Sequence, residues 1–193
     1  MITDLAGRTI VVTGANTGIG LVTARTLAQR GARIIMANRS EDKTRPILDE
    51  LRAAGAQADF VALDLGDLAQ VRAAAARVRE LTDKVHVLCN NAGLAGQRGL
   101  TKDGFELTFG VNHVGPFLFT QLLEPLLRAA APSRIVNVAS AAHYSATGID
   151  WDAVRKPTRT TTAVYEYNVS KLANVLHVAE LARRLAGTGV TSH

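Results

Sequence analysis

The sequence has little cysteine and no long apolar run. Cys89 is the only cysteine among the 193 residues, so an internal disulfide is excluded, and its apolar neighbours indicate a buried thiol rather than a nucleophile. No apolar run is long enough to cross a bilayer, and no charged segment followed by an apolar one precedes the first expected strand. We therefore expect a cytoplasmic protein with neither a membrane span nor a secretory leader.

Aromatic residues and clustered charge are also scarce. The net charge is +5, but the cations are scattered along the chain and aromatic residues make up only 5% of it. Nucleic-acid binding requires charge gathered along one face, so we expect no nucleic-acid partner. We expect no metal site either. A hydrophobic content of 47% is ample for a core, and residues 1–193 are expected to form one domain.

One stretch, residues 10–20, organises the rest of the chain. A β-branched run leads into Thr13 and a turn containing Gly14, Gly18 and Gly20, after which apolar residues recur at helical spacing. A strand, a tight turn and a helix in this order can cradle a pyrophosphate, because the free N–H groups at the helix start face the anion. The spacing T-G-x-x-x-G-x-G is weak evidence alone, and an ordinary strand-to-helix turn remains the alternative.

The remaining chain alternates between strand and helix patterns. Further strands are expected at residues 33–38, 57–63, 85–89 and 134–139, and helices at residues 41–54, from the cap Asp67 onward, at about 104–127 and at 164–186. Residues 140–163 form a polar stretch. This alternation predicts a Rossmann-type doubly wound parallel α/β sheet whose ligands lie beyond the carboxyl ends of the strands.

Polar residues follow two of these strands. Asn38 and Arg39 end the second strand, where an amide and a guanidinium suit the 2′-phosphate of NADP better than the 2′-hydroxyl of NAD. A solvated surface arginine is the alternative. Asp64 follows the third strand and is a candidate to bind an adenine amino group or, equally, to cap the following turn.

The strongest combination of residues is Tyr167 with Lys171. Their spacing of four places them on one face of a helix, where the ammonium group favours the phenolate form of the tyrosine. Tyr165 does not share that face. Ser140 closes the fifth strand, where its hydroxyl is able to donate to the same substrate oxygen. Each residue has a structural interpretation alone, and it is their combination that indicates catalysis.

In its motifs the sequence resembles the short-chain dehydrogenase/reductase family over nearly its whole length. The resemblance is carried by residues 13–20, 90–93, 112, 140 and 167–171. It implies that Tyr167 is the general acid–base, that Lys171 makes the phenol more acidic and binds the nicotinamide ribose, that Ser140 orients the carbonyl, and that Asn112 holds a proton-relay water.

The resemblance also implies a set of cofactor-binding residues. NADP(H) is the expected cofactor and NAD(H) is possible. The implied contacts are Thr13, Gly14, Asn16, Thr17, Gly18, Ile19, Gly20, Asn38, Arg39, Asp64, Leu65, Asn91, Ala92, Gly93, Tyr167 and Lys171.

Within the family, the sequence is similar to the retinol-dehydrogenase-like branch. That similarity rests on the interval of 26 residues between Ser140 and Tyr167, and on residues 112–115 and 170–176. It implies a small apolar carbonyl or alcohol as substrate and a homo-oligomer for a full-length form. A catalytically idle nucleotide-binding or partner-binding fragment is the alternative.

The family pattern continues with a sixth strand, a substrate lid and a seventh strand, whereas this sequence ends at residue 193. We therefore expect a C-terminally truncated member that lacks these strands. Such a chain would leave one sheet edge and the apolar residues of its last helix uncovered, and would be marginally stable with little turnover.

Overall fold

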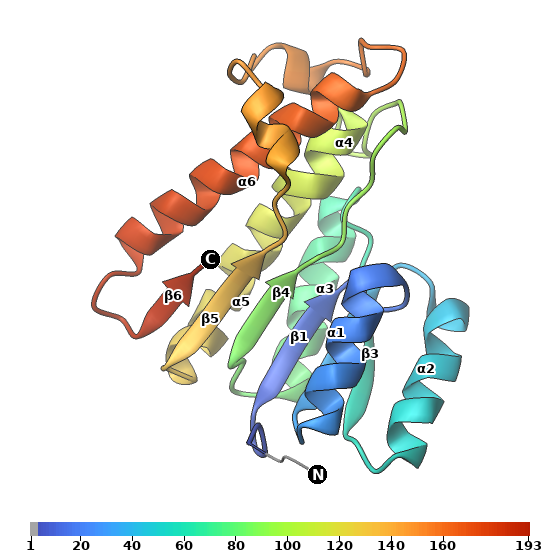
Figure 1. The fold of residues 1–193 in the computed structure, drawn as a ribbon, viewed down its shortest axis with the longest axis vertical. Coiled ribbons are helices and arrows are strands. Elements are labelled where there is room, and N and C mark those ends of the chain that lie inside the picture. The colour runs from blue at the N-terminus through green and yellow to red at the C-terminus, as the bar shows by residue number, and fades with distance from the viewer. Residues whose placement is uncertain (1–3) are drawn as a thin grey trace.

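The computed structural model of the protein describes residues 4–193 as one parallel six-stranded sheet with helices on both faces (Figure 1). The expected domain also takes in residues 1–3, which lie outside the described part. The strands are β1 Thr9–Thr13, β2 Arg33–Asn38, β3 Ala58–Ala62, β4 Val87–Asn90, β5 Ser133–Asn137 and β6 Val190–Ser192. The α-helices are α1 Gly18–Gln29, α2 Glu41–Ala53, α3 Leu68–Leu81, α4 Leu107–Phe109, α5 Gly115–Ala129 and α6 Val164–Arg184.

Side-chain alternation along the strands builds two apolar layers. Val11 and Ile35 face one side of the sheet and pack in a cluster with buried residues of α3, α5 and α6. Ile10 and Ile34 face the other side and pack with buried residues of α1 and α2. Because strand side chains alternate between faces, buried apolar residues at successive positions require helices on both sides, as the sequence predicted.

The strand order places a crevice at the centre of the sheet. The order is β3-β2-β1-β4-β5-β6. Strands β2 and β3 therefore lie on one side of β1, and the chain then crosses to the other side of β1, where β4, β5 and β6 follow. At such a reversal the loops after the two central strands diverge and leave a crevice at their carboxyl ends. The glycine turn after β1 and the Asn91–Gly93 segment after β4 both reach this crevice.

Two of the expected elements need correction. The helix expected at residues 104–127 begins later, at α4, where the Glu106 carboxylate accepts the N–H of Phe109 (2.7 Å). It then passes through a π-helical segment, Gly110–Val114, before α5. The polar stretch 140–163 contains two short 3-10 helices, Ala141–Ser145 and Ala153–Arg155, whose turns the sequence pattern did not reveal.

The expectation that the sixth strand is missing is wrong. Val190–Ser192 pairs in parallel with β5, so the edge of β5 is covered. The last helix is also better packed than expected, because its residues Val169 and Leu181 are buried, although Leu176 remains 53% exposed. Three residues are enough to extend the sheet because each strand residue adds backbone hydrogen bonds to a preformed edge.

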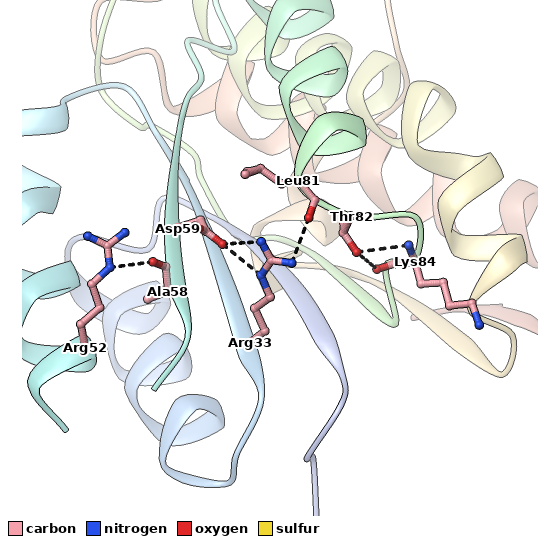
Figure 2. Close-up of polar contacts among 7 residues, drawn as sticks. All are labelled: Arg33, Arg52, Ala58, Asp59, Leu81, Thr82 and Lys84. Atoms are coloured by element: carbon pink, nitrogen blue, oxygen red, sulfur yellow. Dashed lines mark hydrogen bonds and ion pairs between the residues drawn. The ribbon is translucent and has the colours of Figure 1, made fainter. Parts of the chain in front are cut away.

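Charged side chains at the amino ends of the strands serve the fold. Figure 2 shows the Arg33 guanidinium donating to Asp59 Oδ2 (2.7 and 3.0 Å) and to the Leu81 carbonyl (2.9 Å), which ties β2 to β3 and to the end of α3. Beside it, Arg52 Nε donates to the Ala58 carbonyl (2.9 Å). None of the helices within residues 4–193 has the length and apolar composition that crossing a membrane requires.

A cluster of aromatic rings packs α5 against α6. The His177 ring lies 4.9 Å from that of Phe117 and 5.8 Å from that of His113, centroid to centroid. His177 is buried and its Nε2 has no hydrogen-bond partner among the described residues. Burial, with smaller contributions from His113 and Arg184, lowers the pKa of His177 to about 4.

We expect the protein to lose stability in mild acid because of His177. In the unfolded chain His177 takes up a proton near pH 6.5, whereas in the folded chain it stays neutral until the pH approaches 4. The free energy of unfolding therefore falls as the pH decreases across that window. The expected loss is about 2 kcal/mol between about pH 7 and pH 5. Urea unfolding of the protein and of His177→Phe, which keeps an aromatic ring but cannot titrate, measures it. An equal decrease in both proteins would contradict this assignment.

Candidate active site

A cleft of about 1020 Å³ lies at the carboxyl ends of the strands. It is lined by most of the residues that the sequence singled out. These are Gly14, Asn16, Thr17, Gly18, Ile19, Asn38, Arg39, Asp64, Leu65, Asn91, Ala92, Gly93, Ser140, Tyr167 and Lys171. Three others, Thr13, Gly20 and Asn112, do not line the cleft but contact residues that do.

The glycine turn at the start of α1 needs two of its glycines for different reasons. Gly14 adopts a left-handed backbone (φ +65°), and a Cβ there would come within 2.9 Å of the Cα of Ala92. At Gly20 a Cβ would overlap the Gly14 carbonyl oxygen and the Asn91 amide nitrogen. The first turn of α1 therefore lies directly against the β1 loop, and its N–H groups open toward the cleft.

Gly20→Ala should therefore destabilise the fold strongly. The added methyl group meets the backbone carbonyl of Gly14 as well as the Asn91 amide, which is held by its own hydrogen bonds, and we expect the free energy of unfolding to fall by about 3 kcal/mol. Gly18→Ala is the matched control, because Gly18 has a positive φ (+53°) but no atom within 4 Å of the place that an added methyl group would occupy. Its expected cost is about 1 kcal/mol. Thermal unfolding without added nucleotide measures both, and equal losses would show that close packing at Gly20 is unimportant.

Thr13 and Asn91 fasten the glycine turn to β4. The Thr13 hydroxyl accepts the N–H groups of Asn91 and Ala92 (both 3.0 Å). In return the Asn91 side-chain amide donates to the carbonyls of Thr13 (2.9 Å) and Gly14 (3.2 Å). Because these bonds satisfy the backbone around the crevice, the two loops are held in place before any ligand binds.

The structure changes the role expected of Asn38. Its Oδ1 accepts the N–H of Ala15 (2.7 Å) and its Nδ2 donates to Thr44 Oγ1 (3.0 Å), and the side chain is buried. The amide is therefore occupied in joining the glycine turn to α2. Arg39 is exposed at the edge of the cleft and forms no ion pair with another residue of the described chain. Of the two residues, Arg39 is the group left available for an anion.

Asp64 serves the turn that follows β3. Its Oδ1 accepts the N–H of Gly66 (2.8 Å), which is the capping interpretation that the sequence left open. Its carboxylate also lines the cleft beside Leu65. The next carboxylate, Asp67, caps α3 as expected and is held by Lys102 Nζ (2.7 Å), which lowers the pKa of Asp67 to about 2.

Tyr167 and Lys171 face the cleft together from the first turns of α6. The Lys171 ammonium nitrogen lies 5.6 Å from the centre of the Tyr167 ring, as a four-residue spacing on a helix requires. It donates to the Val138 carbonyl just beyond β5 (2.6 Å). Burial lowers the pKa of Lys171 from its ordinary value. The lysine is thus fixed in position by the backbone, beneath a half-buried phenol.

Ser140 and Asn112 reach the site from two other elements. Ser140 caps the 3-10 helix after β5 by accepting the N–H of Ala142 (3.2 Å), and it lines the cleft. The Asn112 side chain is buried in the π-helical segment, where it exchanges hydrogen bonds with the backbone N–H (2.8 Å) and carbonyl (2.9 Å) of Leu94. Asn112 therefore anchors the loop after β4 and does not itself line the cleft.

Sequence reasoning missed two residues on the same face of α6. The Ser170 hydroxyl accepts from Asn112 Nδ2 (3.1 Å) and donates to the Tyr167 carbonyl (2.8 Å), and Asn174 contacts the π-helical segment. Both are buried polar residues. They follow Tyr167 by three and seven residues. The helical periodicity that placed Lys171 on the same face as Tyr167 therefore also places these two residues there.

Comparison with known proteins gives consistent results. The sequence profile of the short chain dehydrogenase family matches residues 8–150. Human retinol dehydrogenase 13 is 46% identical over 190 residues, which cover 97% of this chain and 57% of that protein. The chain thus spans little more than half the length of this relative.

Solved structures show the same fold. An uncharacterized protein of Mycobacterium paratuberculosis has a TM-score of 0.84 at 39% identity and covers 100% of this chain with 68% of its own. The RhlG/NADP active-site complex of Pseudomonas aeruginosa has a TM-score of 0.78 at 30% identity, covering 98% of this chain and 70% of that one. A Burkholderia phymatum short chain dehydrogenase/reductase in complex with NAD has a TM-score of 0.77 at 30% identity, covering 98% and 64%.

Proposed function

Because this chain belongs to the short-chain dehydrogenase/reductase family, we propose that it is an oxidoreductase that uses NADP(H) to interconvert an apolar carbonyl compound and its alcohol. The observation that carries the proposal is the meeting of Ser140, Tyr167 and Lys171 with the glycine turn in one cleft. A dinucleotide site and an acid–base site that share a cleft are what hydride chemistry requires.

The residues of the cleft fit a dinucleotide. The amino end of α1, which begins at Gly18 and has no side-chain cap, presents free N–H groups that suit the pyrophosphate. Arg39 suits a 2′-phosphate, and Lys171 suits the nicotinamide ribose. The acidic residue Glu41 at the start of α2 is paired with Arg45 (2.6 Å) and so repels a phosphate less. When bound, the nicotinamide supplies or accepts the hydride.

The side chains of the site supply the proton chemistry. The Tyr167 hydroxyl gives a proton to the substrate oxygen in reduction and takes it back in oxidation. Ser140 donates a hydrogen bond to the same oxygen and fixes its direction. The Lys171 charge stabilises the phenolate that Tyr167 becomes when it gives up its proton. Asn112 holds a water that relays a proton back to this phenolate.

The apolar substrate class is inferred from the relatives. Several curated relatives are named as retinol dehydrogenases, for example the human protein that is 46% identical. Because this chain spans 57% of that protein, its substrate does not transfer directly. A cytoplasmic location and a homo-oligomer of a longer form remain predictions of the sequence.

A cofactor titration coupled to a turnover screen tests the proposal. The protein is titrated with NADPH and with NADH, and NADPH consumption is then followed with a panel of apolar aldehydes and ketones. We expect tighter binding of NADPH and turnover of at least one aldehyde. Binding of NADPH without turnover of any compound would favour the idle nucleotide-binding fragment, and the absence of binding would exclude both.

A further inference from the structure

Asn174 contacts the π-helical segment with both ends of its side-chain amide. Its Nδ2 donates to the backbone carbonyl of Asn112 (3.1 Å), and its Oδ1 lies 3.1 Å from Nδ1 of His113. The side chain is buried. One residue of α6, two turns beyond Tyr167, therefore holds two consecutive residues of the segment that carries Asn112.

Pro116 removes one hydrogen-bond partner of the Asn112 carbonyl. In an α-helix this carbonyl would accept the N–H of residue 116, but Pro116 has no N–H to give. A donor from elsewhere in the fold compensates a buried carbonyl for such a loss. Asn174 supplies this donor from the neighbouring helix.

The same contact fixes the protonation of His113. The Asn112 carbonyl can only accept, so the Asn174 nitrogen must face it and the Asn174 oxygen must face His113. His113 Nδ1 must then carry the proton. Burial lowers the pKa of His113, which keeps its ring neutral at neutral pH, and the ring packs 5.2 Å from that of Phe109.

We propose that Asn174 is a positioning residue, whose amide sets the backbone geometry at Asn112 relative to Tyr167 and Lys171. The proposal rests on the proposed oxidoreductase function. Asn112 lies between Leu94 and Ser170, and Ser170 in turn bonds the Tyr167 carbonyl. A shift of the Asn112 backbone therefore moves Ser170 and the turn of α6 that carries Tyr167, while the glycine turn stays in place.

Two variants separate the two ends of the amide. Asn174→Asp keeps an acceptor for His113 but removes the donor to Asn112, and we expect kcat to fall by about 10- to 100-fold. His113→Phe keeps a ring and the donor to Asn112, and we expect less than about a threefold fall. Asn168→Asp is the matched control, because Asn168 is buried on the same helix but has no side-chain bond to the π-helical segment. Its kcat should stay within about twofold.

The readouts distinguish positioning from simple stabilisation. A positioning role lowers kcat of the folded Asn174→Asp protein and alters its pH–rate profile, while the dissociation constant for NADPH is unchanged. An Asn174→Asp protein with reduced thermal stability but the kcat and pH–rate profile of the unmodified protein would overturn the proposal. So would a loss of kcat in Asn168→Asp equal to that in Asn174→Asp.

A spectroscopic measurement keeps the proposal testable if the proposed function fails. Nitrogen NMR of the imidazole rings should show His113 as the Nδ1–H tautomer, with exchange of that proton becoming faster in Asn174→Ala. An Nε2–H tautomer of His113 in the unmodified protein would refute the contact itself. Absence of turnover in the unmodified protein with any carbonyl compound would instead refute the proposed function, and the two failures are distinguishable.

Discussion

Tyr167→Phe should lower kcat by about 1,000-fold, because the variant loses the hydroxyl that we propose exchanges the proton with the substrate oxygen. The substitution removes only the hydroxyl, so the ring continues to pack beside Lys171. Cofactor binding should survive, because the glycine turn and Arg39 are unchanged. Steady-state kinetics in an active form of the protein, with a separate NADPH titration, measure the two effects.

The matched control is Tyr165→Phe. Tyr165 lies on the same helix, but it faces a separate cavity and its hydroxyl approaches only Thr147 Oγ1 (3.4 Å) among the described side chains. We expect this variant to retain turnover. An active Tyr167→Phe together with an inactive Tyr165→Phe would reverse the assignment of the acid–base residue.

Arg39→Asp should reverse the cofactor preference. The guanidinium offers charge-assisted bonds to a 2′-phosphate that contribute about 2 kcal/mol, so its loss weakens NADPH binding by about 30-fold. The new carboxylate repels the phosphate and is able to accept from the 2′-hydroxyl of NADH, whose binding should strengthen. Titration of the variant with each dinucleotide measures the ratio of the two dissociation constants.

Arg128→Asp is the control for net charge. Arg128 lies in the last turn of α5, is exposed and does not line the cleft. It changes the charge by the same amount, so we expect only a small weakening of NADPH binding. Equal dissociation constants for NADPH and NADH in the unmodified protein would remove the basis of the NADP assignment.

Much of the fold was predictable from local patterns. The alternation of strands and helices indicated the parallel sheet, and Asp67 marked the start of α3 because a cap is a local signal. The π-helical segment was not predictable in this way. Its residue Asn112 is contacted by Asn174, which lies 62 residues further along the chain, so no local window contains both residues.

The site was predictable to a similar degree. Residues that touch the cleft follow strand ends or share a helix face with Tyr167, and both kinds of position can be recognised in a sequence. The role of Asn38 was not predictable, because the hydrogen bonds of its amide with Ala15 and Thr44 form only once the chain has folded. The short β6 was also missed, because the sequence ends where that strand begins and so few residues were not expected to pair with β5.

The central claim is that the cleft uses a nicotinamide dinucleotide to reduce an apolar carbonyl compound. The most direct measurement of it is the transfer of deuterium to the product alcohol from NADPH that carries deuterium at both hydrogens of nicotinamide C4, followed by mass spectrometry. We predict that the label appears on the former carbonyl carbon, and that Tyr167→Phe suppresses its transfer. An unlabelled alcohol, or labelled alcohol formed equally fast by Tyr167→Phe, would contradict the account.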